Sequence, residues 1–139
     1  MARVKIDLPE IFNFSTNIEI RIGDVNYGGH VGNDAILGIM HTARLKYLAS
    51  FGYSELDLEG VSMIMADSAV QYKGESFFGD TLTVFIQAVE FHKLGFDLIY
   101  KIENQDHKSI AFAKTGMLCF DYKERKLASM PENAKINMQ

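Results

Sequence analysis

The chain has 139 residues, of which 47% are hydrophobic and 23% are charged, the proportions of an ordinary globular domain. A chain of this length can bury a full hydrophobic core without disulfides or a structural metal. Its formal net charge of −4, with no basic run, excludes nucleic acid as the main partner. We find no membrane-spanning stretch and no secretory leader. We therefore expect one cytoplasmic domain over residues 1–139, with no membrane partner.

One cysteine, Cys119, rules out an intrachain disulfide. It lies in an apolar run over residues 116–120, which predicts a buried thiol. This cysteine usage is typical of a reducing compartment.

The first third of the chain predicts a strand, a loop and a helix. Residues 17–23 alternate polar and apolar side chains, the period of a strand with one buried face. The loop over residues 24–33 contains Gly28, Gly29 and Gly32, so its backbone must turn sharply or approach another group closely.

Residues 34–51 predict one long helix. Asn33 or Asp34 is the expected N-cap, and Gly52 is the expected stop. Helical spacing places an apolar stripe on Ile36, Met40, Ala43, Tyr47 and Phe51, and three leucines, Leu37, Leu45 and Leu48, widen it. We expect a short second helical fragment over residues 54–58.

Four further strands are expected over residues 61–72, 81–91, 95–103 and 109–121, separated by turn residues. Their alternation predicts one apolar face each, and these faces carry Ile64, Ala66, Val70 and Tyr72; Leu82, Val84, Ile86 and Ala88; Phe96, Leu98, Tyr100 and Ile102; and Ile110, Phe112, Leu118 and Phe120. The order predicts an α+β fold in which an antiparallel five-stranded sheet wraps around one long helix. Its open edges favour a homo-oligomer.

Several segments resemble the hotdog-fold acyl-CoA thioesterases of the 4-hydroxybenzoyl-CoA thioesterase type, over about residues 17–131. They are RIGDVNYGGHVGN at 21–33, ARLKYL at 43–48, VQY at 70–72 and FGD at 78–80. The resemblance implies a hotdog fold, and a homodimer or homotetramer with its active site between subunits. It implies hydrolysis of acyl-CoA or acyl-carrier-protein thioesters to a free acid and a thiol. It implies no metal and no cofactor besides the coenzyme A of the substrate.

The sequence departs from this family at two positions. The family usually has an aspartate at position 26, as base or nucleophile, where this chain has Asn26, and an acidic residue where it has His41. An amide cannot take a proton at neutral pH, but it can orient water or donate to an oxyanion, and a histidine can serve as the base. The candidate catalytic residues are Asn26, His30, His41 and Asp24. Backbone N–H groups of residues 31–34 are candidate oxyanion donors.

The candidate substrate-binding residues are Tyr27, Gly29, Val31, Asn33, Met65 and Asp67. Structural roles remain open for several of these side chains. Asp24 and His30 could brace the turn, Asp67 could pair with a lysine across the sheet, and Met65 could belong to the core. Arg44 is expected to form a salt bridge between subunits.

Two other functions remain open. The asparagine at position 26 is compatible with a protein that binds an acyl thioester without cleaving it. Asp24, Asn26 and His30 also resemble the Asp-x-Asn-Pro-x-His loop of enoyl-CoA hydratases, although the proline is absent and the histidine lies one position late.

Overall fold

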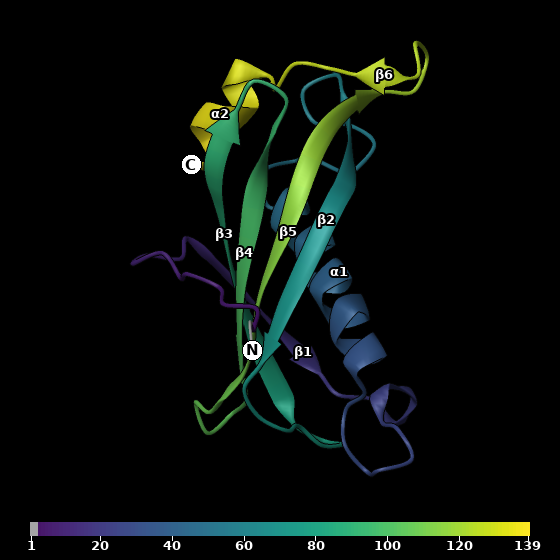
Figure 1. Cartoon of the computed structure of the whole chain (residues 1–139), viewed down its shortest axis with the longest axis vertical. Helices are drawn as coiled ribbons and strands as arrows, with labels where there is room; N and C mark the ends of the chain where they lie inside the picture. Colours follow the sequence, from purple (N-terminus) through teal and green to yellow (C-terminus); the bar gives the residue numbers. More distant parts are fainter. Residues whose placement is uncertain (1–2) are drawn as a thin grey trace.

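The computed structural model of the protein describes residues 3–139, which form one antiparallel sheet and two α-helices (Figure 1). In chain order the elements are β1 (Phe14–Glu19), the 3-10 turn η1 (Ile22–Asp24), α1 (Asn33–Ala49), β2 (Ser62–Tyr72), β3 (Thr81–His92), β4 (Gly95–Glu103), β5 (Ser109–Asp121), β6 (Lys126–Leu127) and α2 (Glu132–Met138). The strand order is β1-β3-β4-β5-β2, and the two-residue β6 pairs with β5. The predicted α+β sheet around one long helix is confirmed.

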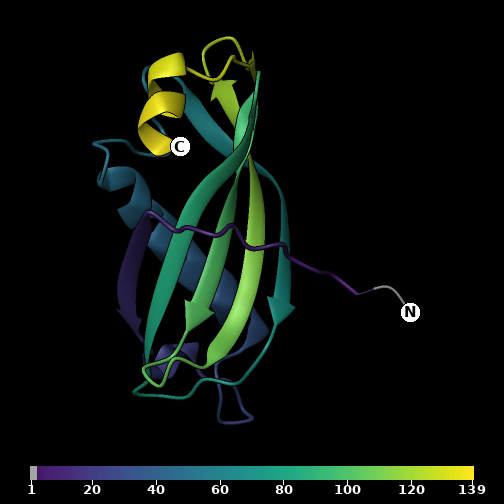
Figure 2. The ribbon, with the colours of Figure 1, turned by 90° about the vertical axis from the view of Figure 1, so that its left-hand side faces the viewer.

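The two faces of the sheet are covered differently (Figure 2). Helix α1 lies along the inner face, whereas the segment that precedes β1 crosses the outer face. Two side chains of the sheet hold this segment, because Gln71 and Gln87 accept hydrogen bonds from the backbone N–H groups of Ile6 and Asn13 at 3.3 and 2.8 Å.

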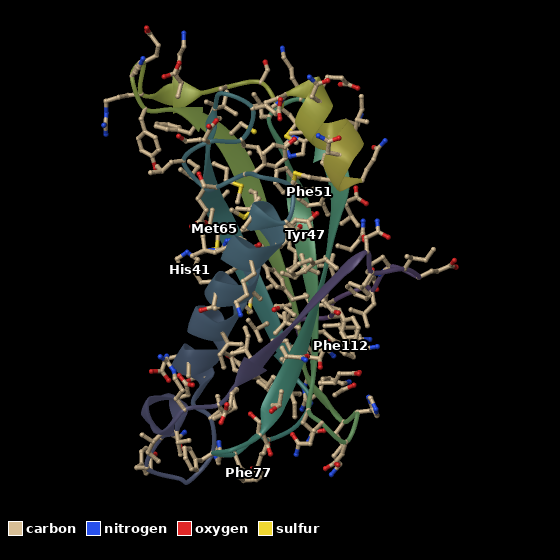
Figure 3. All side chains as sticks on the ribbon, turned by 180° about the vertical axis from the view of Figure 1, so that it is seen from behind. His41, Tyr47, Phe51, Met65, Phe77 and Phe112 are labelled. Atoms are coloured by element: carbon tan, nitrogen blue, oxygen red, sulfur yellow. The ribbon has the colours of Figure 1, made fainter. Side chains whose placement is uncertain are left out.

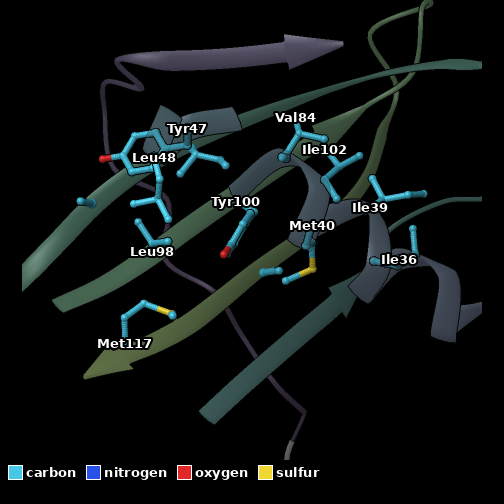
Figure 4. Packing of buried hydrophobic residues seen from close by; sticks show 14 of the residues in the cluster. Ile36, Ile39, Met40, Tyr47, Leu48, Val84, Leu98, Tyr100, Ile102 and Met117 are labelled. Atoms are coloured by element: carbon cyan, nitrogen blue, oxygen red, sulfur yellow. The ribbon is translucent and has the colours of Figure 1, made fainter. Parts of the chain in front are cut away.

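The core lies between α1 and the inner face (Figure 4). The predicted inward residues of β3 and β4 are all buried, and four of the five predicted stripe residues of α1 are buried with them. Leu37 and Leu45 are each 44% exposed, so the prediction that they widen the stripe is wrong. Each lies roughly 100° around the helix from the buried residue that precedes it in the chain, so its side chain is not covered by the sheet.

The ends of α1 differ slightly from the prediction. Gly32, not Asn33 or Asp34, occupies the N-cap position, so the helix begins one residue earlier than expected. It ends at Ala49, and Gly52 then adopts a φ of +80°, which explains why glycine terminates this segment.

The inward faces predicted for β2 and β5 are correct at one residue each, since Val70 packs against the core and Ile110 is buried in it, and wrong at the other predicted residues. In β5 the buried face carries Ala111, Ala113, Thr115, Met117 and Cys119, and Phe112 is half-buried on the other face. Small alanines on the inner face leave room for the side chains of α1. In β2, Met63 is buried instead of Ile64, and a bulge between Met65 and Asp67 interrupts the alternation.

The segments outside the main sheet also differ from the prediction. The expected helical fragment over residues 54–58 is absent, and a turn closed by hydrogen bonds between Ser54 and Asp57 takes its place. Helix α2, which the sequence did not predict, follows Pro131 and buries Ala134 and Met138 against the core. Neither α-helix between residues 3 and 139 has both the length and the apolar character needed to cross a membrane.

Candidate active site

The glycine-bearing loop before α1 is held in place by its own backbone and by the β2–β3 connection. The N–H of Asn26 donates to the carbonyl of His30 at 2.9 Å, and the N–H of Gly32 donates to that of Asp24 at 3.2 Å. The N–H of Val31 donates to the carbonyl of Ser76 at 2.8 Å. These bonds fix the beginning of α1 beside the β2–β3 connection at one end of the molecule (Figure 1).

The side chains of Asn26 and His30 both lie close to Gly28. A Cβ atom placed on Gly28 would lie 3.2 Å from Asn26 Oδ1 and 3.4 Å from His30 Nε2. Asn26 Oδ1 accepts the N–H of Gly28 at 2.9 Å, which leaves the amide nitrogen as the group that can donate to a ligand. The structure therefore brings two of the four candidate catalytic side chains together.

The ring of His30 has distinct roles for its two nitrogens. Nδ1 lies 3.3 Å from the carbonyl oxygen of Val31, which can only accept a hydrogen bond. The neutral ring that fits this contact carries its proton on Nδ1 and keeps a lone pair on Nε2, the atom near Gly28. His30 is thus arranged as a proton acceptor beside Asn26.

Of the four N–H groups considered as oxyanion donors, three have acceptors in the structure. Val31 and Gly32 donate to Ser76 and Asp24, and Asp34 donates to the side chain of Asn33 at 3.0 Å. The N–H of Asn33 has no acceptor among residues 3–139. As the first residue of α1, Asn33 therefore offers the donor at the positive end of the helix dipole.

A cavity of about 250 Å³ adjoins this helix end. It is lined by apolar and polar residues of the loop before α1, α1, β2, the β2–β3 connection and β5, namely His30, Val31, Asn33, Ile36, Tyr72, Gly74, Glu75, Ser76 and Ile110. Three of the predicted site residues, His30, Val31 and Asn33, are among them. Ser76 is only 2% exposed, and its Oγ has no hydrogen-bond partner among residues 3–139.

The other loop candidates have different surroundings. Asp24 accepts the N–H of Arg21 at 2.9 Å and so braces the turn η1, and it lines a separate cavity of about 450 Å³. Tyr27 is fully exposed, and Gly29 adopts a φ of +85°, a conformation that favours glycine. A role in catalysis or binding for these three residues stays a prediction.

His41 lies more than two turns along α1 from the loop and belongs to a network of charged side chains. Its Nε2 is 2.8 Å from Glu55 Oε1, and the buried Arg44 donates to Glu55 Oε2 at 3.1 Å. Arg44 also donates to the hydroxyl of Tyr100 at 3.2 Å, which in turn bonds Thr115 at 2.8 Å. Arg44 therefore forms a salt bridge within the chain, and a salt bridge between subunits stays a prediction.

The network determines the charge of Glu55. Burial alone would raise the pKa of Glu55, but the hydrogen bond from His41 and the charge of Arg44 outweigh this effect and lower it. The carboxylate consequently stays ionised at neutral pH and neutralises the buried guanidinium.

Met65 and Asp67 lie on the edge strand β2, away from the loop. Met65 is 49% exposed and lines a cavity of about 280 Å³ together with His41, and Figure 3 shows both on the same side of α1. Asp67 pairs with Lys114 at 3.0 Å and accepts the N–H of Gly116 at 3.0 Å. The cross-sheet lysine pair considered for Asp67 is present in the structure.

Sequence reasoning missed Ser76 and Glu55. Both lie outside the motifs, in connections where the alternation of polar and apolar residues carries no signal. Glu55 could have been suspected only as a partner for Arg44. Within residues 3–139, no group of three or more His, Cys, Asp and Glu side chains is arranged to hold a metal ion.

An antiparallel sheet around one long helix, with a glycine-bearing loop at the beginning of that helix, defines a hotdog-fold protein. Residues 20–137 match the model of the Thioesterase-like superfamily, and the chain belongs to this family. The predicted family is confirmed, and with it the predicted class of enzyme, a thioesterase.

Curated and solved relatives agree with this family. A 1,4-dihydroxy-2-naphthoyl-CoA hydrolase of Synechococcus elongatus is 28% identical over 125 residues, which cover 86% of this chain and 90% of that protein. The structure of a 1,4-dihydroxy-2-naphthoyl-CoA thioesterase from Synechocystis superposes with a TM-score of 0.81 at 20% identity, covering 90% of this chain and 94% of that one. A gentisyl-coenzyme A thioesterase superposes with a TM-score of 0.80 at 16% identity, covering 91% and 100%.

Proposed function

We propose that this protein hydrolyses the CoA thioester of a compact aromatic acid, at the beginning of α1. The observation that carries this proposal is that His30 and Asn33, whose N–H has no acceptor among residues 3–139, line one cavity, while Asn26 lies close to His30 at Gly28. The names of the relatives, which act on dihydroxynaphthoyl-CoA and gentisyl-CoA, support an aromatic acyl group.

Each of the three groups has a role in the reaction. His30 Nε2 takes a proton from water while the water oxygen bonds to the thioester carbon. The carbonyl oxygen gains the negative charge, which the N–H of Asn33 and the amide of Asn26 stabilise. The C–S bond then breaks, the acid remains, and coenzyme A leaves as a thiolate that takes up a proton.

The cavity supports a compact acyl group. Its volume of about 250 Å³ lies just below the usual range of ligand pockets, and Val31, Ile36 and Ile110 supply apolar walls. A single or fused ring suits such a space better than a long alkyl chain. The curated and solved relatives are named for coenzyme A thioesters, which supports a coenzyme A substrate here, and an acyl carrier protein is the alternative donor.

We further propose that the working form is a homodimer in which a second copy closes the site. The edge strand β2 has a ladder partner on one side, and Leu37, Leu45 and Met65 expose apolar surface on α1 and β2. An open strand edge beside exposed apolar residues is the kind of surface that self-association covers.

Sedimentation of the wild-type protein is expected to give at least twice the chain mass of 15.7 kDa, and sedimentation of the double variant Leu37→Glu/Met65→Glu is expected to give a lower mass. A monomeric wild-type protein would contradict this dimer.

A panel of acyl-CoAs tests the function directly. Wild-type protein is expected to release acid and coenzyme A from benzoyl-CoA and naphthoyl-CoA derivatives, followed by chromatography, and to cleave palmitoyl-CoA much more slowly because the cavity is small. A folded protein that hydrolyses no member above background would overturn the proposal.

Asn26→Asp and a crotonyl-CoA assay separate this proposal from the two alternatives. An inert wild-type protein whose Asn26→Asp variant hydrolyses thioesters would indicate a binding protein, because the added carboxylate supplies the missing base. Loss of the enoyl absorbance of crotonyl-CoA without release of coenzyme A would indicate a hydratase.

A further inference from the structure

A second cavity, of about 370 Å³, adjoins the cavity beside α1. The two cavities share Gly74, Glu75 and Ile110 among their lining residues, so they are immediate neighbours. The volume of the second cavity lies within the usual range of ligand pockets. A ligand whose reacting end lies beside His30 and Asn33 can therefore extend past the shared residues into a second site.

Two lysines, Lys73 and Lys108, line this second cavity. Lys73 follows β2, and its N–H and that of Gly74 donate to the carbonyl of Ile110 at 2.9 and 3.2 Å, which fixes Lys73 beside the beginning of β5. Lys108 immediately precedes β5, and its N–H donates to Asn104 Oδ1 at 3.0 Å. Hydrogen bonds of the backbone therefore hold both lysines beside the cavity.

The fold leaves both ammonium groups available to a ligand. Both lysines are exposed, and neither forms an ion pair with a carboxylate of residues 3–139. The Nζ of Lys73 lies 5.4 Å from the ring centroid of Phe112, a contact with the face of the ring that uses none of the carboxylates. Glu75 is the one carboxylate that lines the cavity, so the two lysines give it an excess of positive charge.

The charge and an exposed ring indicate the chemistry of the ligand. The cavities of about 450 and 440 Å³ elsewhere on the molecule each have three carboxylates against two cations, so an anion is favoured here and not there. Phe77 also lines the second cavity, is 48% exposed, and lies at the end of the molecule that carries the loop before α1 (Figure 3). Lysines bind phosphate groups, and an exposed aromatic ring is a surface on which a base stacks.

We propose that the second cavity binds the nucleotide end of coenzyme A, with Lys73 and Lys108 at its phosphates and Phe77 against its adenine. This inference rests on the proposed function and adds to it, because it makes coenzyme A the preferred donor. A carrier-protein thioester has the same pantetheine arm but no adenine and no 3′-phosphate. The uncharged arm would cross the residues that the cavities share, where its amide N–H groups can donate to the carboxylate of Glu75.

The test compares benzoyl-CoA with the benzoyl thioester of N-acetylcysteamine, which keeps the reacting group and lacks the phosphates and the adenine. Lys73→Gln/Lys108→Gln is expected to lower kcat/KM for benzoyl-CoA about fivefold or more, mainly through KM, because two charge pairs are lost. The value for the truncated thioester should not change. Lys93→Gln/Lys123→Gln is the matched control, because both lysines are exposed in turns at the opposite end of the molecule (Figure 1).

The truncated substrate distinguishes binding of the nucleotide from a structural role. An equal loss of kcat/KM on both thioesters, or no loss on benzoyl-CoA, would overturn the role of the two lysines. The control pair is expected to leave both values unchanged.

Phe77→Ala tests the contact with adenine on the same two substrates. It is expected to lower kcat/KM for benzoyl-CoA about fivefold or more, because a base loses its stacking surface, and to leave the truncated thioester unaffected. Phe78→Ala is the matched control, because Phe78 is 63% exposed and does not line the cavity. A Phe77→Ala variant that resembles wild-type protein on benzoyl-CoA would show that adenine binds elsewhere.

The outcome stays separate from that of the proposed function. If wild-type protein hydrolyses neither thioester, the proposed function fails. Equilibrium binding of coenzyme A and of pantetheine then decides the second site alone. Tighter binding of coenzyme A, lost in Lys73→Gln/Lys108→Gln, supports the site, whereas equal binding of the two ligands, or a preference that the variant retains, overturns it.

Discussion

A His30→Gln variant is expected to hydrolyse its best aromatic thioester with a kcat/KM about 10²–10⁴-fold below that of wild-type protein. Glutamine can still donate to the carbonyl of Val31, as His30 Nδ1 does, so the loop keeps this contact. It cannot take a proton from water at neutral pH, so the reaction loses its base.

The pH profile shows whether His30 acts as a base. A protonated imidazole cannot act as a base, so wild-type kcat/KM should fall as the pH is lowered, and this fall should be absent from the residual activity of the variant. His107→Gln is the matched control, because His107 is exposed in the β4–β5 turn. If His30→Gln retained full activity, His41 would become the base to examine.

Glu55→Ala is expected to lower the free energy of unfolding by about 3 kcal/mol, measured by urea denaturation. The reason is the buried guanidinium of Arg44, which would keep its charge and lose the carboxylate 3.1 Å away. The value is the low end for a broken buried pair, because Glu55 keeps partial contact with water.

Two comparisons test this cause. Arg44→Met in the Glu55→Ala background should recover part of the loss, because it removes the unpaired charge. Glu124→Ala, at an exposed glutamate, should change the stability little. A double variant less stable than Glu55→Ala would show that the charge of Arg44 is not the cause.

The same pair predicts how stability depends on pH. Because the pKa of Glu55 is lower in the folded protein than in the unfolded chain, its contribution is complete above the unfolded value and is lost as the pH falls through the folded value. The difference between wild-type protein and Glu55→Ala should therefore shrink in acid.

Local patterns predicted most of the fold because each strand and α1 repeat apolar residues with a clear period. The prediction failed where tertiary structure overrides the period. β5 turns its alanines and not Phe112 toward the helix, and the bulge in β2 breaks the alternation after Met65. Helix α2 is too short to show a period, and its place depends on burial against the core.

The candidate site was only partly accessible from the sequence. Its motif located Asn26, His30 and the beginning of α1, because those residues are close together in the chain. Ser76 lies 46 positions after His30 and reaches the same cavity only through the packing of the β2–β3 connection, whose carbonyl at Ser76 accepts the N–H of Val31. No local pattern indicates that a serine lacks a hydrogen-bond partner, since this depends on every neighbour in space.

The single cysteine affects how the enzyme can be assayed. Cys119 is buried against Met130, and burial raises the pKa of its thiol to about 11. Reagents such as Ellman's disulfide react with accessible thiolates, so the folded chain should contribute almost no colour. Colour formed during turnover then reports the coenzyme A set free, and the same reagent added in denaturant titrates one sulfhydryl per chain.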